Sequence, residues 1–157
     1  MSGPQKPAHI TLFSREQSGN EVQTDRFEFE GAWYEKAGKP FILFDELVED
    51  GTRVRSVLRI DPDKVAVLRH EKAGGHLILD PNHRQRMKHP SPYGMLEFFV
   101  TTHQLETRIL TDEIQIRAEY SLQLLFDEQE APDSNKQDVY RSLEILIDGK
   151  KESSSDA

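Results

Sequence analysis

The chain has 157 residues, a formal net charge of −8 and no cysteine. A chain of this length can form one domain and bury a core without help from disulfides or metals. The absence of cysteine excludes disulfide frameworks, thiolate zinc sites and thiol nucleophiles. The acidic balance disfavours a dedicated nucleic-acid binder, because such proteins gain affinity by neutralising phosphates.

The sequence predicts a cytoplasmic protein that does not enter a membrane. Its first ten residues, MSGPQKPAHI, lack the apolar segment of a secretory signal. No apolar run approaches the roughly 20 residues that a membrane-spanning helix needs, and 31% of all residues are charged. A chain without cysteine also suits a reducing compartment.

The predicted secondary structure consists of strands, because apolar residues recur with a period of two. In chain order, alternating or dense apolar runs mark residues 9–12, 27–30, 41–44, 54–60, 95–100, 114–126 and 143–147. The clearest run has an apolar residue at every second position from Ile114 to Phe126. This pattern is typical of a strand with one buried and one solvated face, whereas a helix would spread the same residues around its circumference.

Turn signals separate these runs. They are Gly38-Lys39-Pro40, Asp50-Gly51, Asp61-Pro62-Asp63, Gly74-Gly75, Asp80-Pro81-Asn82 and the stretch from Pro90 to Gly94. Short strands joined by turns predict an antiparallel all-β domain, a meander that closes into a barrel or folds into a sandwich. The acidic stretch 127–138 is interpreted as a loop, with a short helix as the alternative.

No motif with catalytic or metal-binding spacing is present. The six histidines form neither a His-x-His nor a His-Glu-x-x-His pair, no serine lies in a Gly-x-Ser-x-Gly turn, and phosphate-binding glycine loops are absent. Glu28 and Glu30 share one strand face, where paired carboxylates can serve acid–base chemistry. A solvent-exposed role opposite Phe27 and Phe29 is the simpler interpretation. We therefore predict no catalytic residue, no metal and no cofactor.

One block departs from the acidic composition. Residues 51–90 carry nine Lys or Arg against four Asp or Glu. Two strand faces in this block are basic, one opposite Leu58 and Ile60 and the other opposite Met87. The candidate anion-binding residues on these two faces are Arg53, Arg55, Arg59, Arg84, Arg86 and Lys88.

The two basic faces could combine into one site. If residues 52–60 pair with 63–70 and residues 75–80 pair with 83–89, the faces lie three strands apart, or roughly 14 Å. Side chains between them, from Arg69, Lys72 or His76, would complete a positive patch for an anionic small molecule or an acidic protein surface. The alternative is ordinary surface charge, which also prevents strand edges from aggregating.

Six segments occur in an order and spacing typical of a known family. They are Gly31-Ala-Trp-Tyr-Glu-Lys36, Val54 to Ile60, Ser91-Pro-Tyr-Gly94, Thr101-Thr-His-Gln-Leu105, Tyr120-Ser-Leu-Gln-Leu124 and Leu143-Glu-Ile-Leu-Ile147. Together they resemble the YwiB-like family, bacterial domains of unknown function with a calycin-like barrel. The chain departs from the family pattern in having Ser-Pro-Tyr-Gly for Thr-Pro-Tyr-Gly and in its longer acidic stretch.

The resemblance implies a fold and carries over no catalytic residue. It implies a single small antiparallel up-and-down barrel of the calycin or lipocalin type, with about 8–10 strands. The barrel would span residues 8–148, with flexible tails at 1–7 and 149–157. By analogy with calycins it also implies a ligand cavity, although a fold does not by itself define a function.

The favoured interpretation is a non-enzymatic binding or interaction protein that engages an anionic ligand or partner. The first alternative is an enzyme whose histidine and carboxylate come from separate barrel strands. The second is a structural adaptor without a small-molecule site. The barrel interior distinguishes these readings, because a sealed apolar interior favours surface interaction and an open interior with polar groups favours ligand binding.

Overall fold

Ten strands form a single antiparallel sheet in the computed structural model, which describes residues 5–47, 51–69, 75–91, 94–125 and 139–149. No described residue is helical. The strands are β1 (Lys6–Ser18), β2 (Glu21–Lys36), β3 (Lys39–Leu47), β4 (Arg53–Asp61), β5 (Lys64–Arg69), β6 (Leu77–Leu79), β7 (Gln85–Ser91), β8 (Gly94–Ile109), β9 (Glu113–Leu124) and β10 (Val139–Gly149).

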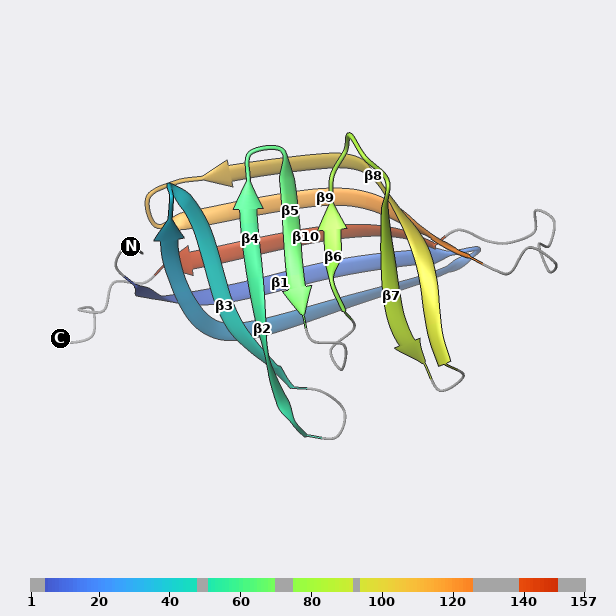
Figure 1. Cartoon of the computed structure of the whole chain (residues 1–157), viewed down its shortest axis with the longest axis horizontal. Helices are drawn as coiled ribbons and strands as arrows, with labels where there is room; N and C mark the ends of the chain where they lie inside the picture. The colour runs from blue at the N-terminus through green and yellow to red at the C-terminus, as the bar shows by residue number, and fades with distance from the viewer. Residues whose placement is uncertain (1–4, 48–50, 70–74, 92–93, 126–138, 150–157) are drawn as a thin grey trace.

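The sheet curls into a nearly closed barrel. Its strand order is β6-β5-β4-β3-β2-β1-β10-β9-β8-β7, so each strand pairs with its sequence neighbour except at the β6–β7 seam, and β1 pairs with β10. Figure 1 shows β4, β5, β6 and β7 side by side in front of β8, β9, β10 and β1. The predicted antiparallel up-and-down barrel with eight to ten strands is confirmed.

The long alternating run forms β9 and faces inward as predicted. Every second residue from Ile114 to Leu122 is at most 5% exposed. Leu124, at the end of the strand, is half-buried, and the predicted inward position of Phe126 lies outside the described residues. The period of two therefore identified the buried face correctly along the described length of the strand.

Apolar side chains fill the barrel interior. The largest fully buried side chains are Trp33, Ile10, Ile42, Leu58, Ile60, Leu79, Ile114, Ile116, Ile145 and Ile147. At one end, the Nζ of Lys6 lies 4.2 Å from the centroid of the Trp33 ring. Gly149 leaves space for this ring, because a Cβ there would lie 3.0 Å from the ring's Cε3. The packed interior favours a function on the surface of the barrel.

The sheet extends slightly beyond the predicted domain of residues 8–148. Lys6 and Pro7 belong to β1, and Gly149 is the last residue of β10. These residues join the barrel because Lys6 pairs with Trp33 on β2, while Gly149 pairs with Ala8 on β1. The other residues of the predicted tails, apart from Gln5, lie outside the described residues, as does the acidic stretch 127–138. None of the described residues forms a helix long and apolar enough to cross a membrane.

Replacing Leu122 by alanine should lower the free energy of unfolding by about 2–5 kcal/mol, because the 5%-exposed side chain would leave a cavity in the core. Its neighbour Gln123 points outward, so Gln123→Ala should change this free energy by only about 0.5 kcal/mol. Urea unfolding of both variants measures the difference. Equal losses at the two positions would contradict the inward orientation of Leu122.

Candidate functional site: a basic outer face

The first predicted basic face is formed by β4. Arg53 and Arg55 are exposed and Arg59 is half-buried, whereas Leu58 and Ile60, on either side of Arg59, are at most 2% exposed. The three arginines therefore point out of the barrel. Their strand, β4, lies on the side facing the viewer in Figure 1. The alternation of charged and apolar residues predicted this orientation correctly.

Among the described residues, only one of these three arginines is bound to a carboxylate. The Nε of Arg55 donates a hydrogen bond of 2.8 Å to Oδ1 of Asp45, the residue opposite it on β3. This hydrogen bond raises the pKa of Arg55 above its usual value. Because the pair lies in solvent, it contributes little to stability. Within the described part of the chain, Arg53 and Arg59 have no ion-pair partner.

The second basic face is organised around an aromatic ring on β8. The guanidinium carbon of Arg84, just before β7, lies 3.8 Å from the centroid of Phe99, and that of Arg86 lies 5.5 Å from it. Arg86 also contacts Glu97, with Nη1 3.6 Å from Oε2. Lys88 is exposed, and Met87 on the other face of β7 is buried, as predicted. Stacking on Phe99 holds Arg84 in place while leaving its N–H groups available for an anion.

The two basic faces lie on the same side of the barrel, but one of the predicted strand pairings is wrong. Residues 56–61 pair with 64–69 as expected. Among the described residues, however, β6 pairs with β5 and β7 pairs with β8. The strands β6 and β7 are the two edges of the sheet. They approach closely at Gly75, where a Cβ would lie 2.7 Å from the carbonyl oxygen of Lys88.

Of the three residues predicted to bridge the two faces, Arg69 does not do so. Arg69 lies opposite the buried Ser56, so it points into the barrel. There its Nη1 lies 3.5 Å from Oε1 of Glu46, and the other carboxylate oxygen of Glu46, Oε2, accepts a 2.7 Å hydrogen bond from the hydroxyl of Ser56. The backbone N–H of Arg69 donates to Nδ1 of His76, and Lys72 lies outside the described residues. Arg69 is therefore not available to the outer surface, because it neutralises Glu46 inside the barrel mouth.

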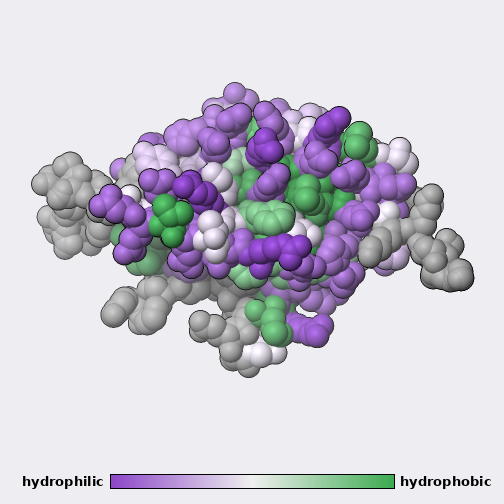
Figure 2. Space-filling view, turned by 180° about the vertical axis from the view of Figure 1, so that it is seen from behind, coloured by the Kyte–Doolittle hydropathy of each residue, from purple (hydrophilic) through white to green (hydrophobic). Residues whose placement is uncertain are grey.

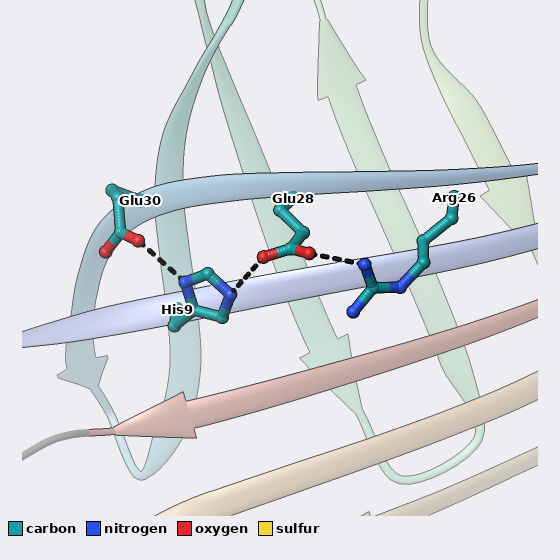
Figure 3. Close-up of polar contacts among 4 residues, drawn as sticks. All are labelled: His9, Arg26, Glu28 and Glu30. Carbon is teal, nitrogen blue, oxygen red and sulfur yellow. Dashed lines mark hydrogen bonds and ion pairs between the residues drawn. The ribbon is translucent and has the colours of Figure 1, made fainter.

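A histidine and two carboxylates from neighbouring strands meet on another part of the outer surface. Figure 3 shows His9 of β1 between Glu28 and Glu30 of β2, with Arg26 beyond Glu28. The ring nitrogens of His9 lie 2.6 Å from Oε2 of Glu30 and 3.0 Å from Oε1 of Glu28. Nη1 of Arg26 donates to the second oxygen of Glu28. Glu28 and Glu30 are solvent-facing, as the simpler interpretation predicted. The sequence pattern did not predict that they contact His9.

The carboxylates favour the charged form of His9. Its pKa is raised above 6.5, first by the hydrogen bond to Glu30, with Glu28 adding a further hydrogen bond and Coulomb attraction. The same attraction ties β1 to β2 on the outside of the barrel. Among the described residues, no three His, Asp or Glu side chains are grouped to hold a metal ion.

A second histidine contact was not foreseen. His103 lies at a bulge of β8, and its Nε2 lies 3.0 Å from the hydroxyl oxygen of Ser121. Its ring is 6.3 Å from that of Tyr140, beside a surface hollow of about 410 Å³. The bulge adds one residue to β8 and thereby breaks the period of two, so the sequence pattern could not assign His103 to a face.

Comparison with known proteins identifies the family. Residues 9–134 match the family model described as Domain of unknown function (DUF1934). The chain belongs to the DUF1934 family. The predicted YwiB-like membership is thereby confirmed. No protein with curated function matches this DUF1934 chain.

A solved structure supports the same fold for the DUF1934 chain. The crystal structure of ywiB protein from Bacillus subtilis matches it with a TM-score of 0.74, covering 94% of each chain at 16% sequence identity. At this identity the likeness establishes a shared barrel and leaves the function of the DUF1934 chain to its own surface residues.

The His9 cluster should make stability depend on pH. A pKa raised in the folded state stabilises the protein below the unfolded pKa of 6.5, and this contribution is lost as the pH rises through the folded pKa. The stability advantage of the native chain over His9→Gln should therefore be larger near pH 5.5 than near pH 8.5, as measured by urea unfolding.

The matched control for this prediction is His89→Gln. His89 is exposed on β7, and the described residues supply no carboxylate partner for it. Its replacement should give a much smaller pH-dependent difference. The role of Glu28 and Glu30 would be contradicted if the native chain exceeded His9→Gln in free energy of unfolding by the same amount at both pH values, or by more at the higher pH.

Proposed function

We propose that this DUF1934 chain is a cytoplasmic, non-enzymatic binding protein that engages an anionic partner through the front of its barrel. The front is the outer surface of the strands nearest the viewer in Figure 1, which include β4, β5, β6 and β7. The observation that carries the proposal is the common side of the two basic faces, on a protein whose net charge is −8. Of the six candidate residues, only Arg55 and Arg86 are paired with a carboxylate in the described structure. The remaining cations are Arg53, Arg59, Arg84 and Lys88.

The packed interior supports binding on the surface. A calycin-like protein that carries a small ligand needs an open space between its strands. Here Trp33, Ile42 and Leu58 are among the side chains that occupy that space, and each is at most 2% exposed. The anionic partner is therefore expected to contact the outer basic side chains, and Arg84 is already oriented for this by Phe99.

The enzyme alternative requires a histidine and a carboxylate from separate strands, and His9 of β1 with Glu28 and Glu30 of β2 supplies both. The surroundings of this cluster favour a structural role. The side chain of Glu30 is 75% exposed, and charges that are open to water are strongly screened. Both ring nitrogens of His9 are already engaged by carboxylates, so this histidine links the two carboxylates of β2 to β1.

Removing four front-face cations should weaken polyanion binding by about tenfold, since four exposed charge contacts at roughly 0.35 kcal/mol each amount to about 1.4 kcal/mol. The variant carries Arg53→Ala, Arg55→Ala, Arg84→Ala and Arg86→Ala. Fluorescence anisotropy with labelled polyglutamate measures the dissociation constant. Binding by the native chain should also weaken as salt is raised, because exposed charges are screened.

The control removes the same charge from other outer surfaces. Its substitutions are Arg15→Ala, Arg26→Ala, Arg108→Ala and Arg117→Ala. Because both variants have the same net charge, only a specific site on the front distinguishes them. Equal losses in the two variants, or binding by the native chain that does not respond to salt, would overturn the proposed function.

A further inference from the structure

Apolar side chains cover the outer surface of β2 to β6, around the first basic face. The cross-strand register aligns outward-facing residues into two rows that run over neighbouring strands. The first row is Tyr34, Phe41, Arg59, Ala66 and Ile78, and the second row is Ala32, Leu43, Val57 and Leu68. Eight of these nine residues are apolar or aromatic, so this surface is apolar with one arginine inside it.

The two rows remain accessible to solvent. Apart from Ala66, which is 8% exposed, every row member is half-buried rather than buried. On the same face of β3, the side chain of Leu47 is 67% exposed and lies opposite Arg53. The inner faces of these strands already form the core, through residues such as Ile42 and Leu58. The outer rows are therefore additional apolar surface, and a contiguous patch of this kind marks an interaction site.

The opposite side of the barrel has a different character. Figure 2 views the molecule from behind and shows a mainly hydrophilic surface with smaller hydrophobic areas. The register of β9, β10 and β1 explains this, because charged and polar residues point outward there. Examples are Gln115, Arg117, Glu119, Ser142, Glu144, Asp148, Thr11 and Arg15, with Phe13, Tyr140 and Leu146 as apolar or aromatic exceptions. The apolar rows are thus a feature of the front.

Positive charge accompanies the rows. Arg59 lies between Phe41 and Ala66 in the first row, and the Nζ of Lys36 lies 5.9 Å from the Phe41 ring. Arg53 and Arg55 lie on the same face of β4. The nearby carboxylate of Asp45 is already bound to Arg55. A complementary partner must therefore offer negative charge together with apolar side chains.

We infer that the front binds an acidic protein segment whose apolar side chains pack on the two rows while its carboxylates reach Arg53, Arg59 and the cations of β7. This inference rests on the proposed function and specifies the partner. An anion without apolar groups would leave the rows in water. A second copy that used the same face would bring two basic surfaces together, because a two-fold contact places identical patches opposite each other.

Two labelled acidic peptides of equal length and equal glutamate content test the inference. One carries leucine at every fourth position, and the other carries serine there. The leucine peptide should bind the native chain about tenfold more tightly than the serine peptide, because it also buries the apolar rows. Fluorescence anisotropy gives both dissociation constants.

Variants of the rows should remove this difference. Leu43→Ser with Val57→Ser should weaken binding of the leucine peptide to the level of the serine peptide, and leave binding of the serine peptide unchanged. Phe13→Ser with Leu146→Ser makes the same chemical change on the back and should have no effect on either peptide. Leu47→Ser, at a side chain that is 67% exposed, tests the same face without disturbing packing and should also weaken leucine-peptide binding.

The possible failures are distinct. If the native chain binds both peptides equally and the four-arginine variant binds both more weakly, the apolar contact is overturned and the proposed function stands. No dependence on those arginines would overturn both. Sedimentation velocity of the chain alone gives a third outcome, since a dimer abolished by Leu43→Ser with Val57→Ser would assign the rows to a second copy and overturn the inference.

Discussion

The pairing of β1 with β10 is the constraint on which the rest of the structure depends. It joins the two ends of the chain through ten residue pairs, from Ala8 with Gly149 to Gln17 with Tyr140. Within it Ile10 lies opposite Ile147, and both are at most 1% exposed. Without this pairing the sheet would fall into two halves, each with another long unpaired edge. With it, the two halves curl toward each other and bury a common core.

Closure of the barrel determines where binding can occur. The inward side chains of the two halves pack together until little space is left for a ligand, as the burial of Trp33 illustrates. The polar groups found inside serve the structure, since Glu46 is held by Ser56 and Arg69. Function is therefore sought on the outer surface, where every second residue of each strand is free to carry chemistry unrelated to the core.

Cross-strand ion pairs account for part of the surface charge. Contacts between neighbouring strands join Arg55 to Asp45, Arg86 to Glu97 and Arg117 to Glu144, and His9 bridges β1 and β2 in the same way. Such exposed pairs stabilise the sheet only slightly. They do engage nearby carboxylates, and within the described residues Arg53, Arg59 and Arg84 are left without an ion-pair partner.

The sequence by itself determined the all-β class, the inward face of β9 and the outward face of Arg53, Arg55 and Arg59. These follow from the period of two, which is a local property of extended backbone. Tertiary structure decided the rest. Residues 65–68 are apolar on both faces, so only the register with β4 shows that Arg69 points inward. The separation of β6 from β7, the contact of His9 with Glu30 and the apolar rows all depend on which strands become neighbours. Which strands become neighbours is set when the barrel closes, through contacts between residues far apart in the chain. A local sequence pattern carries no information about those contacts.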